Sequence, residues 1–388
     1  MKTVLVTDCW SRKALSAVRS LGKKGIIVHV VTHKLLSPAA YSLHANKSFF
    51  FPNPVTHREE YREKLFSLIK TRNYNCVIPM DTDTSKIIIN GMDELRNYTS
   101  IPIVSKDIFN KANDKWQVYQ LANKLNIPTP KSFLPETKEQ IVETLHELDF
   151  PVIIKPRDSL GSRGIAKVNN RREFNKYYYN IKDIYGLPIV QECINPSSQG
   201  IGVGLLCNNG EILVSFSYKR LREFPVNGGP STLRESTDNK LIKEYAAQLL
   251  KELNFHGVAM VEFKFDSNYI CPKLLEINPR FWGSLELAQV AGINFPYLLY
   301  QLSQNNVIKP QEYKVGIKCR WLLPGDILHF LANPKRFSLK PSFFNFFDKN
   351  TFYDQLKLDD KRGSIATIVC TILSLFDYET WKIGIFRK

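Results

Sequence analysis

The sequence predicts an α/β protein with more than one domain. Three observations support this prediction. Strand-like and helix-like segments alternate over the first hundred residues, a strand at 151–156 runs into a Gly/Ser loop and a second strand, and an alternating strand at 257–265 precedes the segment L-L-E-I-N-P-R-F-W-G-S at 274–284. The chain has 388 residues, which is too many for one small core and suits two or three domains.

The composition is that of a globular protein, with 44% hydrophobic and 23% charged residues. The formal net charge of +16 is compatible with a nucleic acid, a membrane surface or an anionic substrate such as a nucleotide. No block of basic residues interleaved with aromatic ones is present in the sequence, and a lysine-rich composition accounts for most of the charge. We therefore expect small-molecule substrates and no nucleic-acid partner.

Cysteine usage and the N-terminus both favour a cytoplasmic protein. The seven cysteines are scattered and none forms a C-x-x-C pair, which argues against a disulfide framework or a zinc site. The opening segment M-K-T-V-L-V-T-D is typical of a first strand, because its apolar run is too short for a signal peptide. The longest apolar stretch, residues 364–376, is shorter than the roughly 20 residues that span a membrane. We expect a buried helix there, with docking to a membrane interface as the alternative.

The first hundred residues predict a parallel sheet. Strands and helices are expected in turn at residues 4–6, 14–21, 26–31, 61–70 and 76–79. In such sheets, ligands bind beyond the carboxyl ends of the strands. Four polar residues lie there: Ser11, Arg12, Asp81 and Asp83. They suit either a substrate role or helix capping and turn chemistry. No G-x-G-x-x-G follows the first strand, so a dinucleotide is not predicted.

A second region begins with a predicted helix at 116–125, for which Asn113 or Asp114 is a suitable cap. The strand at 151–156 ends in Lys155 and leads through a loop at 157–164 into another strand. This order predicts a hairpin and differs from the strand-loop-helix of a Walker P-loop. A lysine at a strand end can simply reach towards water. The Gly/Ser loop that follows favours a nucleotide role, because its amides can fold over phosphates.

The next hundred residues continue with strands, turns and one long helix. A strand is expected at 187–192, and a hairpin turned at Asn208-Asn209-Gly210 joins strands at 202–206 and 211–218. The Gly/Pro-rich stretch 224–232 is expected to be a loop, followed by an amphipathic helix from 238 to about 253. Strands at 257–265 and 273–278 follow, and we expect them to pair with each other.

The residues Glu262, Glu276 and Asn278 predict a magnesium site. Glu276 and Asn278 are two apart on one strand and share a face, and antiparallel pairing would add Glu262 from the other strand. Carboxylate and amide oxygens suit Mg²⁺, which fills its other positions with substrate phosphates. Arg280 follows at once and could grip a phosphate with two hydrogen bonds. Solubilising charge on an edge strand is the alternative, which the apolar neighbours disfavour.

Taken together and in order, these segments resemble the ATP-grasp superfamily, on the branch that includes the ATP-binding halves of carbamoyl-phosphate synthase and the carboxylate–amine ligases. The resemblance runs from the N-terminus to about residue 305, and the first hundred residues resemble the parallel-sheet, Rossmann-like domain that precedes the ATP-grasp core. Each piece alone is weak evidence, whereas the ordered set is highly specific. The matching pieces are Lys115, Lys155, the loop from Ser159 to Gly164, the strand Gln191-Glu192-Cys193-Ile194, Glu262, and E-x-N-P-R from Glu276 to Arg280.

The resemblance implies a role for each of these pieces. Lys115 and Lys155 would contact the phosphates of ATP, and the loop residues Ser159, Gly161, Ser162 and Gly164 would cover them. Gln191, Glu192, Cys193 and Ile194 would hold adenine at the hinge between subdomains. Glu262, Glu276 and Asn278 would hold Mg²⁺ (or Mn²⁺), and Arg280 would stabilise the transferred phosphoryl group. The implied reaction is phosphorylation of a carboxylate by ATP, after which an amine attacks the acyl phosphate to give an amide.

Two stretches depart from the family pattern. Many members present an acidic residue to the ribose after the hinge, whereas residues 195–200 here contain none. The second stretch, residues 228–236, resembles a loop of carboxylate–amine ligase-like members and would lie where the acyl phosphate forms. Arg234 could bind the substrate carboxylate there, with Ser231 and Thr232 as hydrogen-bond donors. A glycine-rich connection capped by serine is the alternative for this stretch.

The resemblance predicts four parts: a parallel α/β domain at 1–104, an ATP-grasp lid subdomain at 105–185, a central subdomain that binds Mg-ATP at 186–310, and a C-terminal extension at 311–388. The aromatic stretch 337–347 in the extension is expected to pack on the core, although a partner or a membrane could also take it. Homodimers are common in the family. Two rival functions stay open: a bicarbonate-activating enzyme of the carboxylase or carbamoyl-phosphate type, and a non-catalytic ATP-binding protein.

Overall fold

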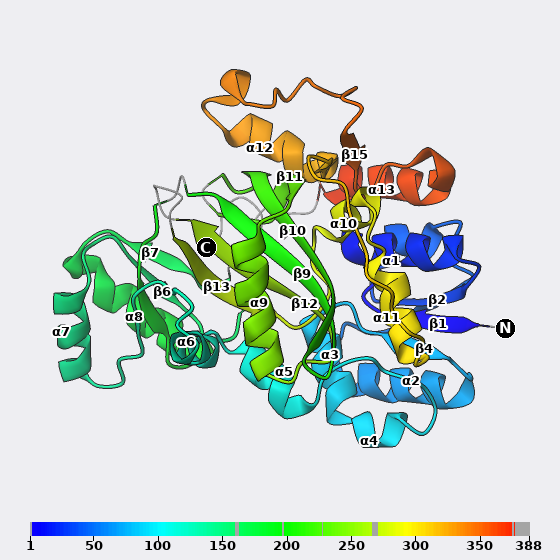
Figure 1. Cartoon of the computed structure of the whole chain (residues 1–388), viewed down its shortest axis with the longest axis horizontal. Coiled ribbons are helices and arrows are strands. Elements are labelled where there is room, and N and C mark those ends of the chain that lie inside the picture. The colour runs from blue at the N-terminus through cyan, green and yellow to red at the C-terminus, as the bar shows by residue number, and fades with distance from the viewer. Residues whose placement is uncertain are drawn as a thin grey trace.

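The computed structural model describes residues 2–159, 163–195, 198–226, 228–265, 271–374 and 376. Its described strands form three sheets, of four, seven and four strands. The seven-stranded sheet lies in the middle of the molecule, with the N-terminal sheet on one side and a smaller lobe on the other (Figure 1). The predicted α/β fold class is confirmed.

The N-terminal sheet is parallel throughout, in the order β3-β2-β1-β4, as the sequence predicted. Its strands are β1 (Thr3–Val6), β2 (Ile27–Thr32), β3 (Lys47–Phe50) and β4 (Cys76–Ile78). The helices of this part are α1 (Arg12–Lys23), the short 3-10 helix η1 (Pro38–Tyr41), α2 (Arg58–Thr71), α3 (Thr82–Asn90) and α4 (Met92–Leu95). Strand β3 was not predicted from the sequence, because its residues are half-exposed or exposed and show no apolar face.

The central sheet has the order β13-β12-β9-β10-β11-β14-β15, and all its pairs are antiparallel except β14–β15. Its strands are β9 (Gly200–Asn208), β10 (Glu211–Glu223), β11 (Ser231–Thr237), β12 (Gly257–Phe265), β13 (Pro272–Asn278), β14 (Lys318–Arg320) and β15 (Thr351–Tyr353). The helices α9 (Lys240–Glu252), α10 (Leu285–Ala291) and α11 (Phe295–Ser303) pack against it. Two hydrophobic cores each contain residues of this sheet and of the N-terminal sheet, so the two sheets are joined by continuous packing.

The smaller lobe contains a four-stranded antiparallel sheet in the order β5-β8-β6-β7, with its own small core around Ile154, Phe174 and Tyr178. Its strands are β5 (Ser132–Phe133), β6 (Val152–Lys155), β7 (Ala166–Val168) and β8 (Ile189–Glu192). The helices of this lobe are α7 (Lys138–Glu147) and α8 (Arg171–Tyr185), whereas the preceding α5 (Lys106–Asn113) and α6 (Lys115–Lys124) contribute to one of the two large cores. The antiparallel pairing of β6 with β7 confirms the predicted hairpin.

One predicted loop is partly wrong. Residues 228–236 were expected to be a loop, but the chain enters β11 at Ser231. This strand pairs with β10 on one side and with β14 of the C-terminal extension on the other. Backbone hydrogen bonds to both neighbouring strands stabilise the extended conformation of β11, although the Gly/Pro-rich residues just before it are typical of a loop. The second partner, β14, lies about 85 residues away in the sequence.

The C-terminal extension also contains η2 (Leu322–Asp326), α12 (Ile327–Ala332), η3 (Arg336–Ser338), η4 (Leu358–Asp360) and α13 (Lys361–Ser374). Among the described helices, none combines the length and the apolar character needed to span a bilayer. The expected helix near the C-terminus is present as α13, but the expectation that it is buried is wrong for one of its faces, on which Ile365 is 60% exposed. In the aromatic stretch 337–347, Phe343 is buried whereas Phe347 is almost fully exposed.

Candidate functional site

The two strands β12 and β13 place the predicted metal ligands together. They pair antiparallel, as predicted, with Glu262 directly opposite Glu276 and Met260 opposite Asn278. Directly opposed residues lie on the same face of an antiparallel pair, and Asn278 lies two residues beyond Glu276. The three oxygen-bearing side chains therefore share one face at the end of the sheet that precedes Arg280.

Each carboxylate of this face has a cationic neighbour from another element. Glu262 forms an ion pair with Arg220 of β10, with 2.6 Å between Oε2 and Nη2. Glu276 lies 3.4 Å from the Nζ atom of Lys115, the first residue of α6. The amide of Asn278 donates to Glu276 Oε1 at 2.8 Å and accepts from Arg280 Nη2 at 3.0 Å. Charges from three parts of the chain thus converge on one face.

The two glutamates differ in their electrostatics. Burial raises the pKa of Glu262, and the facing Glu276 carboxylate adds to that rise while Arg220 opposes it. Burial alone would also raise the pKa of Glu276, but Lys115, the hydrogen bond from Asn278 and Lys155 together lower it. The repulsion between the two carboxylates therefore raises mainly the pKa of Glu262. A divalent cation between the carboxylates would relieve this repulsion.

The donor set fits Mg²⁺. Two carboxylates and an amide oxygen are hard ligands, and Mg²⁺ in nucleotide sites takes few protein ligands and leaves its other positions to phosphates and water. Among the described residues, no cluster of three or more His, Cys, Asp or Glu side chains could hold a metal by itself. A metal at this face would therefore depend on Asn278 or on a bound phosphate to complete its coordination.

Lys115 and Ser159 form the phosphate side of the candidate site. Asp114 caps α6 by accepting from the backbone amides of Trp116 and Gln117, which fixes Lys115 at the start of the helix. Lys115 Nζ donates to the carbonyl oxygen of Ser159 at 3.1 Å. The Ser159 hydroxyl is buried and has no hydrogen-bond partner in the described part of the chain. An unpartnered buried hydroxyl on a residue that contacts the Lys115 ammonium is a suitable donor for a phosphate oxygen.

The rest of the predicted phosphate-covering loop is only partly described. Gly161 and Ser162 lie outside the described residues. Gly164 has a φ of +68°, and a Cβ there would lie 2.7 Å from the Tyr185 ring and 2.8 Å from Pro156. This position therefore requires glycine for both its backbone conformation and its space.

Lys155 is deeply buried at the end of β6. Its Nζ atom lies 2.6 Å from the Tyr119 hydroxyl and 2.8 Å from Gln191 Oε1. Burial and the neighbouring Lys115 ammonium lower the pKa of Lys155 to about 7, with Glu276 opposing the shift. Within the described residues, no carboxylate lies within 4 Å of Lys155. The Lys155 amine is therefore available to bind an anionic ligand such as a phosphate group.

The predicted adenine segment spans the end of β8. Gln191 is buried between Lys155 and the Ser132 hydroxyl, to which it donates at 2.6 Å. Glu192 accepts from the backbone amide of Lys131 at 3.0 Å and forms an ion pair with Lys273 of β13. Cys193 and Ile194 follow β8 and are half-exposed. This segment therefore lies between the small lobe and the central sheet.

Arg280 connects the metal-binding face to the N-terminal sheet. Its Nε atom donates to the Thr82 hydroxyl at 3.0 Å and lies 3.8 Å from Asp81 Oδ1. Asp81 caps α3 and also pairs with Lys13, at 3.2 Å. Burial and the nearby Arg280 lower the pKa of Lys13 to about 8. The candidate site thus extends to the carboxyl ends of β1 and β4, where ligands of parallel sheets bind.

Arg234 is fully buried rather than open to a substrate. It forms an ion pair with Asp354 of the C-terminal extension. A substrate could reach its guanidinium only by displacing Asp354. The neighbouring Arg12 lies 3.5 Å from the other Asp354 oxygen, stacks on Trp321 at 4.0 Å and keeps 13% of its side chain exposed. Burial and Arg234 lower the pKa of Arg12 to about 10, with Asp354 opposing the shift.

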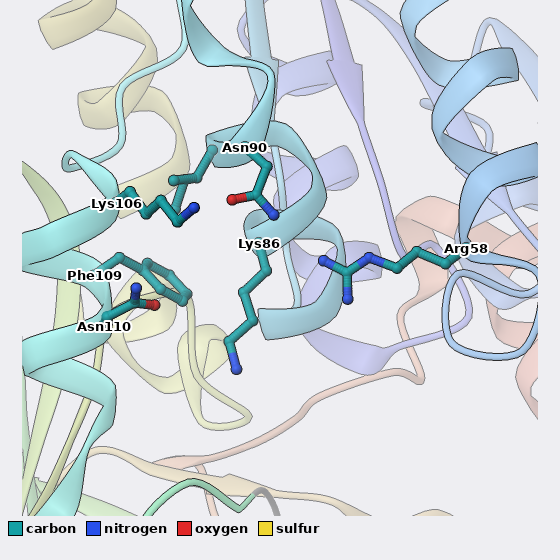
Figure 2. A pocket seen from close by; sticks show the side chains of 7 residues that line it. Arg58, Lys86, Asn90, Lys106, Phe109 and Asn110 are labelled. Atoms are coloured by element: carbon teal, nitrogen blue, oxygen red, sulfur yellow. The ribbon is translucent and has the colours of Figure 1, made fainter.

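A separate pocket lies on the N-terminal part and contains none of the predicted site residues (Figure 2). Its lining comprises Arg58, Lys86, Ile89, Asn90, Lys106, Phe109 and Asn110. Lys86 also forms an ion pair of 2.5 Å with Asp158, at the start of the predicted phosphate-covering loop. The pocket is therefore next to the candidate site but not part of it.

Three further side chains that organise the site, Lys13, Tyr119 and Arg220, were not predicted from the sequence. Tyr119 lies one helical turn after Lys115 and donates to the carbonyl oxygen of Leu275 at 2.7 Å, which ties α6 to β13. That spacing of four residues was a usable signal. Lys13 gave no local signal, because its partner Asp81 comes from another part of the chain. Arg220 pairs locally with Glu223 at 3.7 Å, but its pairing with Glu262 of β12 joins distant residues.

A family model described as an ATP-grasp domain matches residues 112–284, which include Lys115, Lys155 and the E-I-N-P-R segment. The large chain of carbamoyl phosphate synthase from Vibrio vulnificus (strain CMCP6) is 23% identical over 190 residues, which are 46% of this chain and 17% of that protein. The matching part is therefore a small fraction of this relative.

Two solved structures illustrate the shared fold. Biotin carboxylase from Campylobacter jejuni, in a complex with β,γ-ATP, has a TM-score of 0.69 and 17% identity, with 82% of this chain and 74% of that chain covered. An L-amino acid ligase from Bacillus licheniformis has a TM-score of 0.61 and 13% identity, with 79% and 75% covered. At these identities the likeness concerns the fold.

Proposed function

Because this chain belongs to the ATP-grasp superfamily, we propose that it is an ATP-dependent ligase that activates a carboxylate as an acyl phosphate and joins it to an amine. The observation that carries the proposal is the meeting of Glu262, Glu276 and Asn278 with Lys115 on one face. The L-amino acid ligase and the biotin carboxylase among the fold neighbours support a carboxylate-activating reaction.

In this proposal, Glu262, Glu276 and Asn278 hold Mg²⁺ or Mn²⁺. The bound metal would supply positive charge that neutralises the phosphate oxygens of ATP. Arg220 opposes the rise in the pKa of Glu262 that burial causes, and Lys115 helps to lower the pKa of Glu276. Both cations thus favour the anionic form of these partly buried carboxylates, which is the form that binds a metal ion.

The nucleotide would be held by the residues around Lys155. Lys115, Lys155 and the Ser159 hydroxyl would contact the phosphates, and the loop that includes Gly161, Ser162 and Gly164 would cover them. Gln191, Glu192, Cys193 and Ile194 would contact adenine. Arg280, which donates to Thr82, would stabilise the transferred phosphoryl group.

We propose that Arg12 contacts the carboxylate of the acid substrate and that Arg234 positions Arg12 through Asp354. Asp354 takes up the charge of Arg234, whereas the Arg12 guanidinium stays partly exposed beside Trp321. Arg234 then orients Asp354, and Asp354 orients Arg12. A flat guanidinium backed by an aromatic ring suits a planar carboxylate.

The proposed reaction balances in two steps. An oxygen of the acid bonds to the γ-phosphorus of ATP while the bond to ADP breaks, which gives ADP and the acyl phosphate. The amine nitrogen then bonds to the acyl carbon, phosphate leaves, and the amine gives up a proton. The contribution of the protein is positioning and charge stabilisation.

The test is ADP release from Mg-ATP with pooled carboxylic acids and hydroxylamine, which traps an acyl phosphate as a hydroxamate. We expect hydroxamate with the unaltered protein and none with Glu276→Gln. The acid that gives the product identifies the first substrate. Binding of Mg-ATP without ADP or hydroxamate from broad pools would contradict the proposal and favour a non-catalytic ATP-binding protein.

Bicarbonate activation is the second candidate, because biotin carboxylase is among the fold neighbours and carbamoyl phosphate synthase among the relatives. The same assay separates the two candidates. ADP release that requires bicarbonate and no organic acid would favour this second function over the proposed one.

A further inference from the structure

The last described helix, α13, turns an apolar stripe towards solvent. The stripe consists of Ile365, Ile368, Val369, Ile372, Leu373 and the following Phe376, all of which are exposed. Their spacing of three and four residues is the pattern that normally faces a protein core. Ile365 is 60% and Phe376 83% exposed. Leu35 and Leu36, next to α13, are exposed as well and extend the apolar surface.

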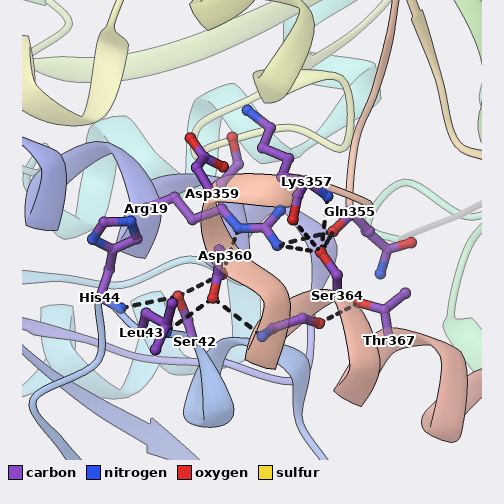
Figure 3. A network of polar contacts seen from close by, with 12 residues as sticks. Arg19, Ser42, Leu43, His44, Gln355, Lys357, Asp359, Asp360, Ser364 and Thr367 are labelled. Carbon is purple, nitrogen blue, oxygen red and sulfur yellow. Dashed lines mark hydrogen bonds and ion pairs between the residues drawn. The ribbon is translucent and has the colours of Figure 1, made fainter.

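The inward face of α13 is built from small residues, and its orientation is fixed. Arg19 of α1 donates to Asp360 at 2.7 Å, and the pair is almost fully buried (Figure 3). Asp360 also accepts from the backbone amide of Gly363 at 3.1 Å. A Cβ at Gly363 would lie 2.4 Å from Asp360 Oδ2. These contacts, together with buried Ala366 and Thr367, place the small residues of α13 against the protein. The large apolar side chains of the helix therefore face solvent.

The surroundings of the stripe are basic. Lys361 and Arg362 are exposed at the start of α13, and the sequence from 361 to 376 contains no acidic residue. Exposed Lys34 neighbours Cys370 of α13 and lies 5.3 Å from the ring of exposed Trp10. Burial raises the pKa of the Cys370 thiol on α13, and the neighbouring Lys34 ammonium opposes that shift. The exposed Asp359 beside the stripe is paired with Lys23.

We propose that the outward face of α13 docks on an anionic phospholipid surface. Along α13, from Ile365 to Leu373, the stripe extends over about 12 Å at 1.5 Å per residue, which is too short to cross the roughly 30 Å hydrocarbon core and suits a helix lying in the interface. Charge decides between a membrane and a second copy of the chain. Two copies would bring like charges together around the stripe, whereas Lys34, Lys361 and Arg362 complement anionic headgroups.

The test is co-sedimentation of the full chain with vesicles of phosphatidylcholine, with and without added phosphatidylglycerol. We expect binding to the anionic vesicles that weakens as salt rises, because salt screens the headgroup attraction. Ile372→Glu should weaken binding at least tenfold, since the variant loses one apolar insertion and gains a repelled charge. Ile184→Glu is the matched control, because Ile184 is an exposed isoleucine on α8 of the small lobe. It should leave binding unchanged.

Three outcomes would overturn the proposal. The first is absence of binding to anionic vesicles, or equal binding by Ile372→Glu with an unchanged urea unfolding curve. The second is a dimer, measured by light scattering, that Ile372→Glu converts to a monomer while vesicles have no effect. The third is vesicle binding gained only when the chain is cut after residue 376, which would mean that residues 377–388 cover the stripe.

Discussion

Binding of Mg-ATP should be accompanied by proton uptake at Lys155. The pKa of this lysine is lowered to about 7 in the free protein, first by burial and then by the Lys115 ammonium. At pH 8 the amine is therefore mostly neutral, with about one side chain in ten protonated. A triphosphate beside the amine favours the charged form and raises its pKa. Nucleotide binding at pH 8 should therefore take up protons, roughly 0.8 per site if the bound pKa is about 9 and roughly 0.9 if it is about 10.

Isothermal titration calorimetry at pH 8, in buffers of different ionisation enthalpy, measures this quantity. The slope of the apparent binding enthalpy against buffer enthalpy gives the number of protons taken up. Lys155→Arg is the control, because arginine keeps the positive charge and cannot be deprotonated in proteins. We expect its slope to fall by most of one proton while some affinity remains. The slope that remains is the background from other groups such as Lys13, whose pKa is lowered to about 8 and which is unchanged in this variant.

A slope of zero for the unaltered protein, or proton release, would refute this reasoning. An equal slope in Lys155→Arg would also refute it, because the titrating group would then lie elsewhere. Proton uptake should decline as the pH falls below about 7, where the lysine is already protonated in the free protein.

Two further predictions concern the frame of the site. Asp354→Asn should lower the free energy of unfolding, measured in urea, by about 3–5 kcal/mol, because it leaves fully buried Arg234 without its carboxylate. The control Asp359→Asn, at an exposed ion pair, should cost less than about 1 kcal/mol. Equal effects of the two substitutions would contradict the pairing of Arg234 with Asp354. Gly202→Ala should cost roughly 1–3 kcal/mol, since a Cβ at Gly202 would lie 2.5 Å from the Tyr218 ring, and an unchanged urea midpoint would show that the ring has room to move.

The part of the site that could be predicted from the sequence is local. Glu276 and Asn278 share a strand, and Glu262 lies on the strand just before it, so period-two alternation and one antiparallel pairing were enough. The hairpin that carries Lys155 was predicted in the same way. In both cases the partner strand is a near neighbour in the sequence.

The rest depends on contacts between distant residues. The pairing of Arg234 with Asp354 joins residues 120 apart, and β11 is a strand partly because β14 of the C-terminal extension pairs with it. The exposure of the apolar face of α13 could not be predicted from the sequence either. An apolar run predicts burial, and only the position of Gly363 against Asp360 shows which side faces the protein.

In the proposed function, this chain binds Mg-ATP through the face of Glu262, Glu276 and Asn278. Titration of ATP into the protein by calorimetry, with Mg²⁺ and then with excess EDTA, tests this binding. We predict binding that requires Mg²⁺ and that Glu276→Gln weakens by at least about tenfold, a loss of about 1.4 kcal/mol. Absence of ATP binding, or binding of equal strength with EDTA and in Glu276→Gln, would contradict it.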